Sequence, residues 1–302
     1  MVGHNPVHEP RQPPKSAAAL WAPLAHFIAG EARLGQWAEQ RHGTAFLYEF
    51  IRFGVKQGWA CLFGGATVAL IVGTHLWYPR GAPLARYDFM FLAAVAIQIA
   101  LLAFKLETWE EAKVILIYHV VGTLMEIFKT DVGSWIYPEQ NFFRLGGVPL
   151  FSGFMYAAIG SYIARCWRLF DFRFDRHPPL WAVFALGVAI YVNFYAHHYT
   201  IDIRYLLFAT AALMFGRTWI YYRVWHVYRR MPLLLGTFLV ALFVWIAENL
   251  GTLTKTWLYP HQMAGWSAVS FGKLGSWFLL LFLSYALVAA VNRPAPMKFT
   301  SP

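Results

Sequence analysis

The sequence predicts an all-α, polytopic membrane protein with about eight transmembrane helices, built as two parallel four-helix repeats and preceded by an N-terminal interfacial helix. Three observations lead to this prediction. Charged residues make up only 13% of the 302 positions, whereas hydrophobic residues make up 59%. Eight segments are long and apolar enough to cross a bilayer, and one motif occurs twice at corresponding places in the chain.

The composition excludes an ordinary soluble domain, in which roughly a quarter of the residues are charged. Most of the exterior must therefore face lipid. Lys and Arg outnumber Asp and Glu by 25 to 15, which gives a formal net charge of +10. Such an excess is typical of cytoplasmic loops that lie beside anionic membrane lipids. No zinc, helix-turn-helix or base-stacking motif accompanies it, so we expect no nucleic-acid partner.

The eight predicted spans follow from the length of the apolar segments, since a bilayer core of about 30 Å needs about 20 mostly apolar residues per helix. They are 58–77, 87–104, 111–129, 149–170, 180–196, 204–221, 232–250 and 272–291. Residues 31–56 mix charged and aromatic side chains and predict an amphipathic helix at the membrane interface. We therefore expect a disordered tail (1–30), this interfacial helix (31–56), a first repeat (57–170), a second repeat (171–293) and a short tail (294–302).

The distribution of Lys and Arg predicts the orientation. Of the 25 basic residues, 18 lie in the tails, the interfacial helix, and in or beside the loops that follow the second, fourth and sixth spans. The other loops hold 7. Basic residues concentrate on the cytoplasmic side, so we expect both termini there.

The repeated motif is seen when residues 126–140 are aligned without gaps against residues 248–262. Six positions are identical: Glu126, Thr130, Trp135, Tyr137, Pro138 and Gln140 correspond to Glu248, Thr252, Trp257, Tyr259, Pro260 and Gln262. Four helices return the chain to its starting side, so the two halves have the same orientation and are related by an axis along the membrane normal. Both motifs then face the non-cytoplasmic side.

Glu126 and Glu248 are the candidate acid-base residues. At 1.5 Å per residue each lies about 24 Å into its span, and a carboxylate there is costly unless it faces the bundle interior. The candidate binding residues lie near the same depth or on the same helix face. They are His75, His119, Thr130, Trp135, Tyr137, His197, His198, Asn249, Thr252, Trp257 and Tyr259.

Several kinds of chemistry fit this set. Two acids with histidines can bind a divalent metal, relay protons or perform acid-base catalysis on a lipid-soluble substrate. No H-x3-H or E-x2-H pair indicates a particular metal, so the metal and any cofactor stay unknown. The structural alternative is that each Glu pairs with Arg86, Arg204 or a backbone amide, while the Trp and Tyr residues form an interfacial aromatic belt.

Several segments resemble a bacterial multipass membrane family catalogued as domain of unknown function 817. They are residues 128–139 and 147–162, the pair His197-His198, and the run from Trp245 to Asn249 that includes Glu248. The resemblance extends over nearly the whole chain from about residue 45. It implies a protein of the bacterial inner (plasma) membrane and implies no activity.

A remoter resemblance is to membrane-bound lycopene cyclases and carotenoid hydratases, which repeat an acid, T-x2-G-x-W and then G-x-P-L. Here these elements are Glu126, the stretch 130–135 and the stretch 147–150. The cyclases continue with two glutamates where this chain has Phe151-Ser152. The resemblance therefore implies a shared scaffold rather than cyclase activity.

The leading hypothesis is a membrane protein that binds or transforms a hydrophobic substrate, such as a lipid or isoprenoid, between the repeats near the outer leaflet. Its expected partners are membrane lipids and a hydrophobic small molecule. A proton-coupled secondary transporter and a structural subunit of a membrane complex are the alternatives.

Overall fold

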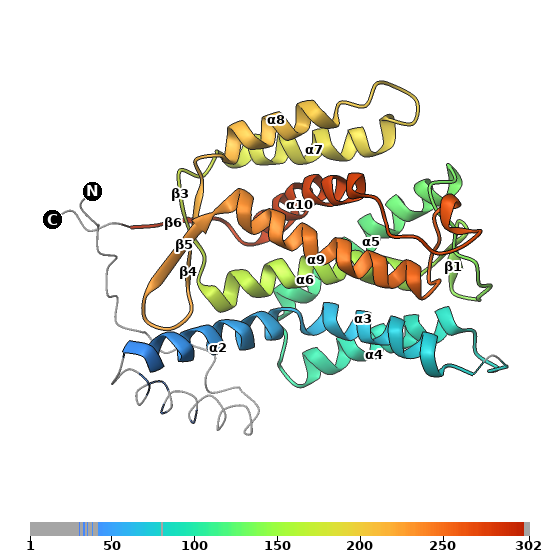
Figure 1. Cartoon of the computed structure of the whole chain (residues 1–302), viewed down its shortest axis with the longest axis horizontal. Coiled ribbons are helices and arrows are strands. Elements are labelled where there is room, and N and C mark those ends of the chain that lie inside the picture. The colour runs from blue at the N-terminus through green and yellow to red at the C-terminus, as the bar shows by residue number, and fades with distance from the viewer. Residues whose placement is uncertain are drawn as a thin grey trace.

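The computed structural model describes residues 42–79 and 81–298, together with residues 30, 33, 35 and 38. Nearly all of the predicted tail 1–30, much of the segment 31–41 and the last four residues of the tail 294–302 lie outside the described residues. The described part is mostly helical. Figure 1 shows most helices running along the long axis of the molecule, with a small sheet at one end.

Nine α-helices occur in the described residues. They are α2 (His42–Ala60), α3 (Leu62–Trp77), α4 (Arg86–Ala103), α5 (Trp109–Asp131), α6 (Phe151–Phe170), α7 (Leu180–Ala196), α8 (Arg204–Phe215), α9 (Leu233–Leu253) and α10 (Phe271–Val291). Each of the eight predicted spans overlaps one of the helices α3 to α10. The predicted interfacial helix overlaps α2, which continues to Ala60.

A four-stranded sheet is the main departure from the predicted all-α fold. It has the order β5-β4-β3-β6 and consists of β3 (Arg173–Asp175), β4 (Trp219–Arg223), β5 (Tyr228–Pro232) and β6 (Ala295–Pro296). The prediction of a span over 204–221 was wrong in its last third, because α8 ends at Phe215 and Tyr221 pairs with Arg173 and Arg230. Residues 219–222 are aromatic or β-branched, and such residues favour strands when partner strands are present.

The sheet gathers three connections at one end of the molecule (Figure 1). β3 follows α6, the hairpin β4–β5 follows α8, and β6 follows α10. The helix pairs α7–α8 and α9–α10 each therefore leave this end and return to it. A second, two-stranded sheet of β1 (Arg144–Leu145) and β2 (Val148–Pro149) lies at the opposite end, where Gly146 and Gly147 adopt positive φ angles in the turn.

In the described part of the chain, three helices are long and apolar enough to cross a membrane: α4, α9 and α10. α2 and α3 form a fourth candidate if the pair is one span bent by 67° at Cys61. α7 and α8 are apolar but shorter. Large hydrophobic side chains are exposed on these helices, for example Phe243 on α9 and Leu213 on α8. These properties support the coarser prediction of a membrane protein.

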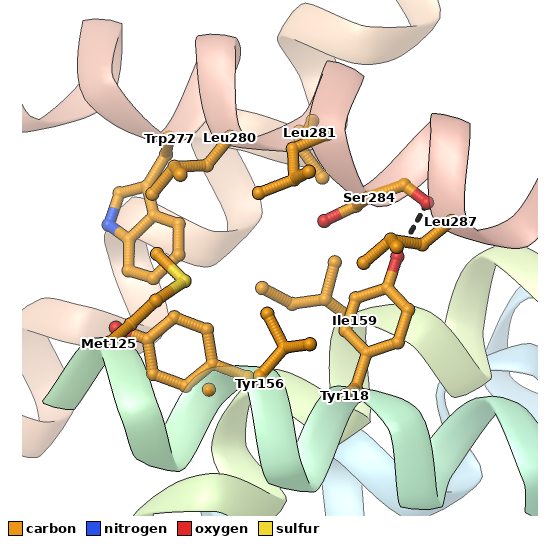
Figure 2. A pocket seen from close by; sticks show the side chains of 12 residues that line it. Tyr118, Met125, Tyr156, Ile159, Trp277, Leu280, Leu281, Ser284 and Leu287 are labelled. Carbon is orange, nitrogen blue, oxygen red and sulfur yellow. Dashed lines mark hydrogen bonds between the residues drawn. The ribbon is translucent and has the colours of Figure 1, made fainter. Parts of the chain in front are cut away.

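The helices α5 and α6 pack closely because glycine residues of α6 face α5. A Cβ atom at Gly153 would lie 2.7 Å from the carbonyl oxygen of His119, and one at Gly160 would lie 2.6 Å from the Tyr118 ring. Small residues allow helix backbones to approach in this way. Figure 2 shows the neighbouring contact with α10, where the Tyr118 hydroxyl donates a 2.5 Å hydrogen bond to the carbonyl of Ser284.

One ion pair is completely buried in this packing. Arg165 of α6 lies 3.2 Å from Glu107 in the α4–α5 connection, and both side chains have no exposed surface. Gln98 also donates a hydrogen bond to Glu107. Burial raises the pKa of Glu107, and the Arg165 guanidinium opposes this shift. The pair fixes the α4–α5 connection against α6.

We predict that Arg165→Met destabilises the fold by about 3–5 kcal/mol, because it leaves the Glu107 carboxylate buried without its partner. Thermal unfolding in detergent, followed by tryptophan fluorescence, measures the change. Glu110→Gln is the matched control, since Glu110 pairs with Lys113 on the surface and its loss should cost within about 0.5 kcal/mol. The double variant Arg165→Met/Glu107→Leu should regain part of the loss. An Arg165→Met protein as stable as wild type would contradict this role.

Candidate functional site

The two copies of the repeated motif meet at the end of the molecule opposite the four-stranded sheet. Ile136 and Leu258 form an isolated antiparallel bridge, with backbone N–H···O distances of 2.9 and 3.0 Å. These two residues occupy the same position in the two motifs. The bridge therefore joins the copies through equivalent backbone atoms.

Glu126 is buried beneath this bridge and accepts hydrogen bonds from three aromatic side chains. Trp135 and Tyr137 of the same motif donate to Oε2 at 2.6 and 2.7 Å. Tyr156 of α6 donates to Oε1 at 2.8 Å. The repeated spacing from the acid to the Trp and Tyr thus has a direct cause, because the chain after α5 folds back over the carboxylate.

Glu248 is buried in a similar way. The Tyr259 hydroxyl, which corresponds to that of Tyr137, donates to Oε1. The Trp277 indole of α10 donates to Oε2 at 2.6 Å. Trp277 follows Glu248 at nearly the same distance along the chain as Tyr156 follows Glu126. Both carboxylates are thus held by a Tyr of their own motif and by an aromatic side chain of the next helix.

One difference between the two environments lies three residues after each glutamate. Gly251 stands in the second motif where Lys129 stands in the first. The Trp257 ring lies directly over Gly251, since a Cβ atom there would be 1.9 Å from the ring. At the equivalent position of the first motif, the Lys129 side chain leaves no room for a ring. The corresponding Trp135 donates a hydrogen bond to Glu126 instead. The site is therefore paired but not symmetric.

Ring contacts connect the two carboxylate environments. Trp135 and Tyr259 lie edge to face with centroids 6.0 Å apart, and Tyr156 and Trp277 have centroids 6.0 Å apart. Figure 2 shows Trp277 and Tyr156 with the Met125 side chain between them, at the border of the α5, α6 and α10 interface. Each pair contains one hydrogen-bond donor to Glu126 and one donor to Glu248, so the two acids belong to a single cluster.

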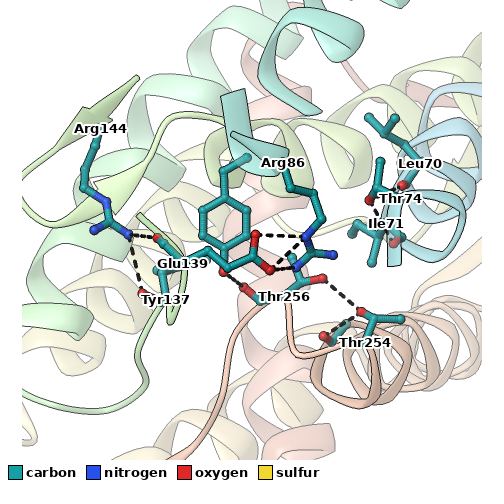
Figure 3. Close-up of polar contacts among 11 residues, drawn as sticks. Leu70, Ile71, Thr74, Arg86, Tyr137, Glu139, Arg144, Thr254 and Thr256 are labelled. Carbon is teal, nitrogen blue, oxygen red and sulfur yellow. Dashed lines mark hydrogen bonds and ion pairs between the residues drawn. The ribbon is translucent and has the colours of Figure 1, made fainter. Parts of the chain in front are cut away.

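The arginines considered as structural partners of the glutamates bind elsewhere. Arg86 pairs with Glu139 at 2.6 Å and Arg204 pairs with Asp202 at 2.5 Å. Figure 3 shows the Arg86–Glu139 pair beside Thr256, whose carbonyl accepts a hydrogen bond from Tyr87. The contacts of Arg86 and Tyr87 fasten the motif loops to α4. Among the described residues, both glutamates therefore accept hydrogen bonds from uncharged side chains.

A large cavity opens beside the two acids. Its volume is about 1180 Å³, and α2, α3, α6, α9 and α10 contribute most of its lining. The lining is mostly apolar away from the acids, with residues such as Phe50, Val68 and Phe243. Drug-sized ligands commonly occupy pockets of about 300–1,000 Å³. The space is therefore sufficient for a molecule with a long hydrocarbon chain.

Cationic side chains also line the acid end of this cavity, namely Lys129, Arg204 and Lys273. Lys129 Nζ lies 2.6 Å from His198 Nε2 and 3.5 Å from His197 Nε2. Desolvation and the nearby charge of Lys129 lower the pKa of His198. A neutral imidazole can accept a hydrogen bond from the ammonium group. The histidine pair therefore positions Lys129.

The predicted binding residues separate into three groups. Trp135, Tyr137, Trp257, Tyr259 and His197 line the cavity, and His198 contacts Lys129. Asn249 and Thr252 instead hold the loop before α10: Asn249 accepts from the Val269 amide and Thr252 accepts from the Trp266 indole.

The third group, with three residues, neither lines the cavity nor holds the loop before α10. His75 is exposed at the end of α3. The ring of His119 lies between α5 and α6, tilted against the Phe154 ring with the centroids 4.4 Å apart. Thr130 is half-buried on α5, and no partner for its hydroxyl is found among the described side chains. Counting residues along a helix therefore does not by itself show which side chains line the cavity.

Four residues of the cluster were not predicted: Lys129, Tyr156, Lys273 and Trp277. Lys129 follows Glu126 by three positions and thus shares its helix face. Lys273 is a charge at the start of an apolar span, which indicates a functional position. Tyr156 and Trp277 carry no comparable signal. In the part of the chain that the structure describes, no three His, Cys, Asp or Glu side chains are placed to hold a metal ion.

Comparisons with known proteins agree on one family. The model of "Protein of unknown function (DUF817)" matches residues 49–285. The uncharacterized protein YoaT of Bacillus subtilis (strain 168) is 39% identical over 245 residues, which are 81% of this chain and 92% of that protein. No solved structure matches. These matches do not confirm the remoter resemblance to lycopene cyclases. The chain belongs to the DUF817 family of proteins of unknown function.

Proposed function

We propose that this protein binds or transforms a hydrophobic molecule, such as a lipid or isoprenoid, in the cavity that ends at Glu126 and Glu248. The observation that carries the proposal is the cavity itself. It offers about 1180 Å³ of mostly apolar space and has two buried carboxylates at one end. Burial of apolar surface drives the binding of such a molecule.

The proposed setting is a multi-pass protein of the bacterial inner membrane, with α3 to α10 as eight spans in two four-helix repeats. The return of α6, α8 and α10 to one sheet supports this arrangement. So does the bridge between Ile136 and Leu258, because pairing of equivalent residues is what a two-fold relation produces. The basic loops lie at the sheet end, which we assign to the cytoplasm together with both termini. The acids then lie toward the outer leaflet.

In this proposal Glu126 and Glu248 act as the acid-base pair. Each carboxylate accepts hydrogen bonds from phenol and indole groups, which carry no full charge. A carboxyl group in such a place can exchange a proton with a bound substrate when the substrate reaches it. The aromatic donors keep both groups at fixed positions.

Proton-coupled transport is the second candidate. Gln57 and Tyr162 form a 2.9 Å hydrogen bond and line the same cavity, nearer the sheet end of α6. This amide–hydroxyl pair is a polar part of the cavity wall that lies apart from the acids, as a transport path would require. The rest of the wall between them is mostly apolar, which favours a hydrophobic molecule over an ion.

We predict that Glu126→Gln and Glu248→Gln each change the amount or the chemical form of the hydrophobic molecule that co-purifies with the protein. The amide keeps the shape of the side chain but removes the ionisable group. Its NH2 group faces hydrogen-bond donors, so we also expect the free energy of unfolding to fall by about 1–3 kcal/mol. Mass spectrometry of lipid extracts measures the bound molecule, with Glu110→Gln as the surface control. Folded Gln variants that retain the wild-type molecule in the wild-type amount would argue against a role for the acids.

We also predict that Val240→Trp, on the α9 wall of the cavity, lowers the occupancy of a hydrophobic ligand about tenfold or more, because a loss of 1.4 kcal/mol in binding is already tenfold. Thermal stability should change little, since the indole enters open space. Val188→Trp is the control, because Val188 is 61% exposed on α7. Equal ligand occupancy in wild type and Val240→Trp would show that the cavity is not the binding site.

A further inference from the structure

Two lysines at the acid end of the cavity have no carboxylate partner within the described residues. Lys129 is only 4% exposed, and its Nζ atom contacts the His197 and His198 rings and lies 4.2 Å from the centroid of Phe194. Lys273 Nζ lies 4.5 Å from the centroid of Tyr259 and 5.0 Å from that of Trp135. Both ammonium groups thus rest against aromatic faces and imidazoles.

The nearby acidic groups accept hydrogen bonds from other side chains. Glu126 and Glu248 interact with the charge of Lys273 only at longer range, without a direct ion pair among the described residues. The oxygens of Glu126 and Glu248 accept hydrogen bonds from tyrosine and tryptophan side chains. Asp202 pairs with Arg204, the third cation of the lining. An ammonium group removed from water without a paired anion is costly. Aromatic faces compensate only part of this cost.

The rest of the cavity restricts which kind of anion can contact Lys129 and Lys273 directly. The lining runs from the lysines past Trp277 and Ile159 to Phe50, and most of it is apolar. A small free anion would use only one end of this space. A molecule with one charged head and a long hydrocarbon chain would use both ends.

We propose that the ligand is an amphiphile with a single anionic head group, which Lys129 and Lys273 bind while its chain occupies the apolar part of the cavity. The proposal rests on the function proposed above and specifies the chemistry of the ligand. The head group is a carboxylate or a phosphate monoester, since both accept charge-assisted hydrogen bonds from ammonium groups. Glu126 and Glu248 lie beside the head, where the functional group nearest to it would react.

The test compares ligands that differ only in charge. Full-length protein in detergent micelles is mixed with oleic acid or oleyl alcohol, and in a second arm with farnesyl phosphate or farnesol, and bound ligand is counted by native mass spectrometry. Wild type should favour the charged member about tenfold or more in at least one arm, because charge-assisted hydrogen bonds are worth more than about 1.4 kcal/mol. The arm that shows the preference identifies the head group as carboxylate or phosphate.

The variants assign the preference to the two lysines. Lys129→Gln and Lys273→Gln should each lower the charged-to-neutral ratio severalfold, whereas Lys129→Arg should retain most of it. Lys113→Gln, at an exposed surface position, should leave the ratio unchanged. The ratio of bound charged ligand to bound neutral ligand does not depend on how much of a variant is folded, because both ligands need the same folded protein.

The outcomes separate this proposal from the one on which it rests. If wild type binds the alcohols as well as the acids, or if Lys→Gln lowers both equally, the anionic head group is wrong while a hydrophobic ligand stands. If none of the four molecules binds, both proposals fail.

Discussion

The pairing of the two motif loops is the contact on which the rest of the site depends. Ile136 and Leu258 exchange two backbone hydrogen bonds, and each is followed directly by the tyrosine that binds a buried carboxylate. If the loops separated, Tyr137 and Tyr259 would no longer close over Glu126 and Glu248. The acids would then keep only Tyr156 and Trp277 as aromatic donors, and a buried carboxyl group that loses hydrogen bonds is costly. The bridge and the acids therefore stabilise one another.

A duplicated motif need not produce two identical sites. The difference between Lys129 and Gly251 shows how one position changes the local packing, because Trp257 lies over the glycine whereas Trp135 bonds Glu126. The cations of the lining are also unequally distributed, with Lys129 from α5 and both Arg204 from α8 and Lys273 from α10. The result is one asymmetric cluster, which suits a ligand with a distinct head and tail better than a symmetric one.

The parts of the fold that could be predicted are those that correspond to apolar segments and to the repeated motif. The helices α3 to α10 coincide with apolar segments, and the spacing of Glu126, Trp135 and Tyr137 reflects a local loop that folds back on its own helix. The sheet could not be predicted, because β3 and β6 are only two or three residues long and depend on distant partners. Tyr156 and Trp277 were missed for a related reason, since their approach depends on how α6 and α10 are rotated.

The histidines show the corresponding limit. Counting residues along a helix gives depth, and His75 and His197 have similar depth in their predicted spans. Only the packing of neighbouring helices decides which side faces the interior, and it leaves His75 exposed while His197 lines the cavity. Family membership adds no activity to this picture, so the geometry of the cluster carries the functional argument.

Cysteine cross-linking of the two motif loops tests the central claim most directly. Ile136→Cys and Leu258→Cys are combined in a chain whose native Cys61 and Cys166 are replaced by alanine, and intact membranes are treated with a mild oxidant. Residues opposite one another in an antiparallel bridge have Cα atoms about 5.5 Å apart, within the range that a disulfide spans. We predict rapid cross-linking of this pair and none when Leu253→Cys, exposed on α9, replaces Leu258→Cys. Two thiols that react with a maleimide but never cross-link would contradict the paired loops, and with them the shared site of Glu126 and Glu248.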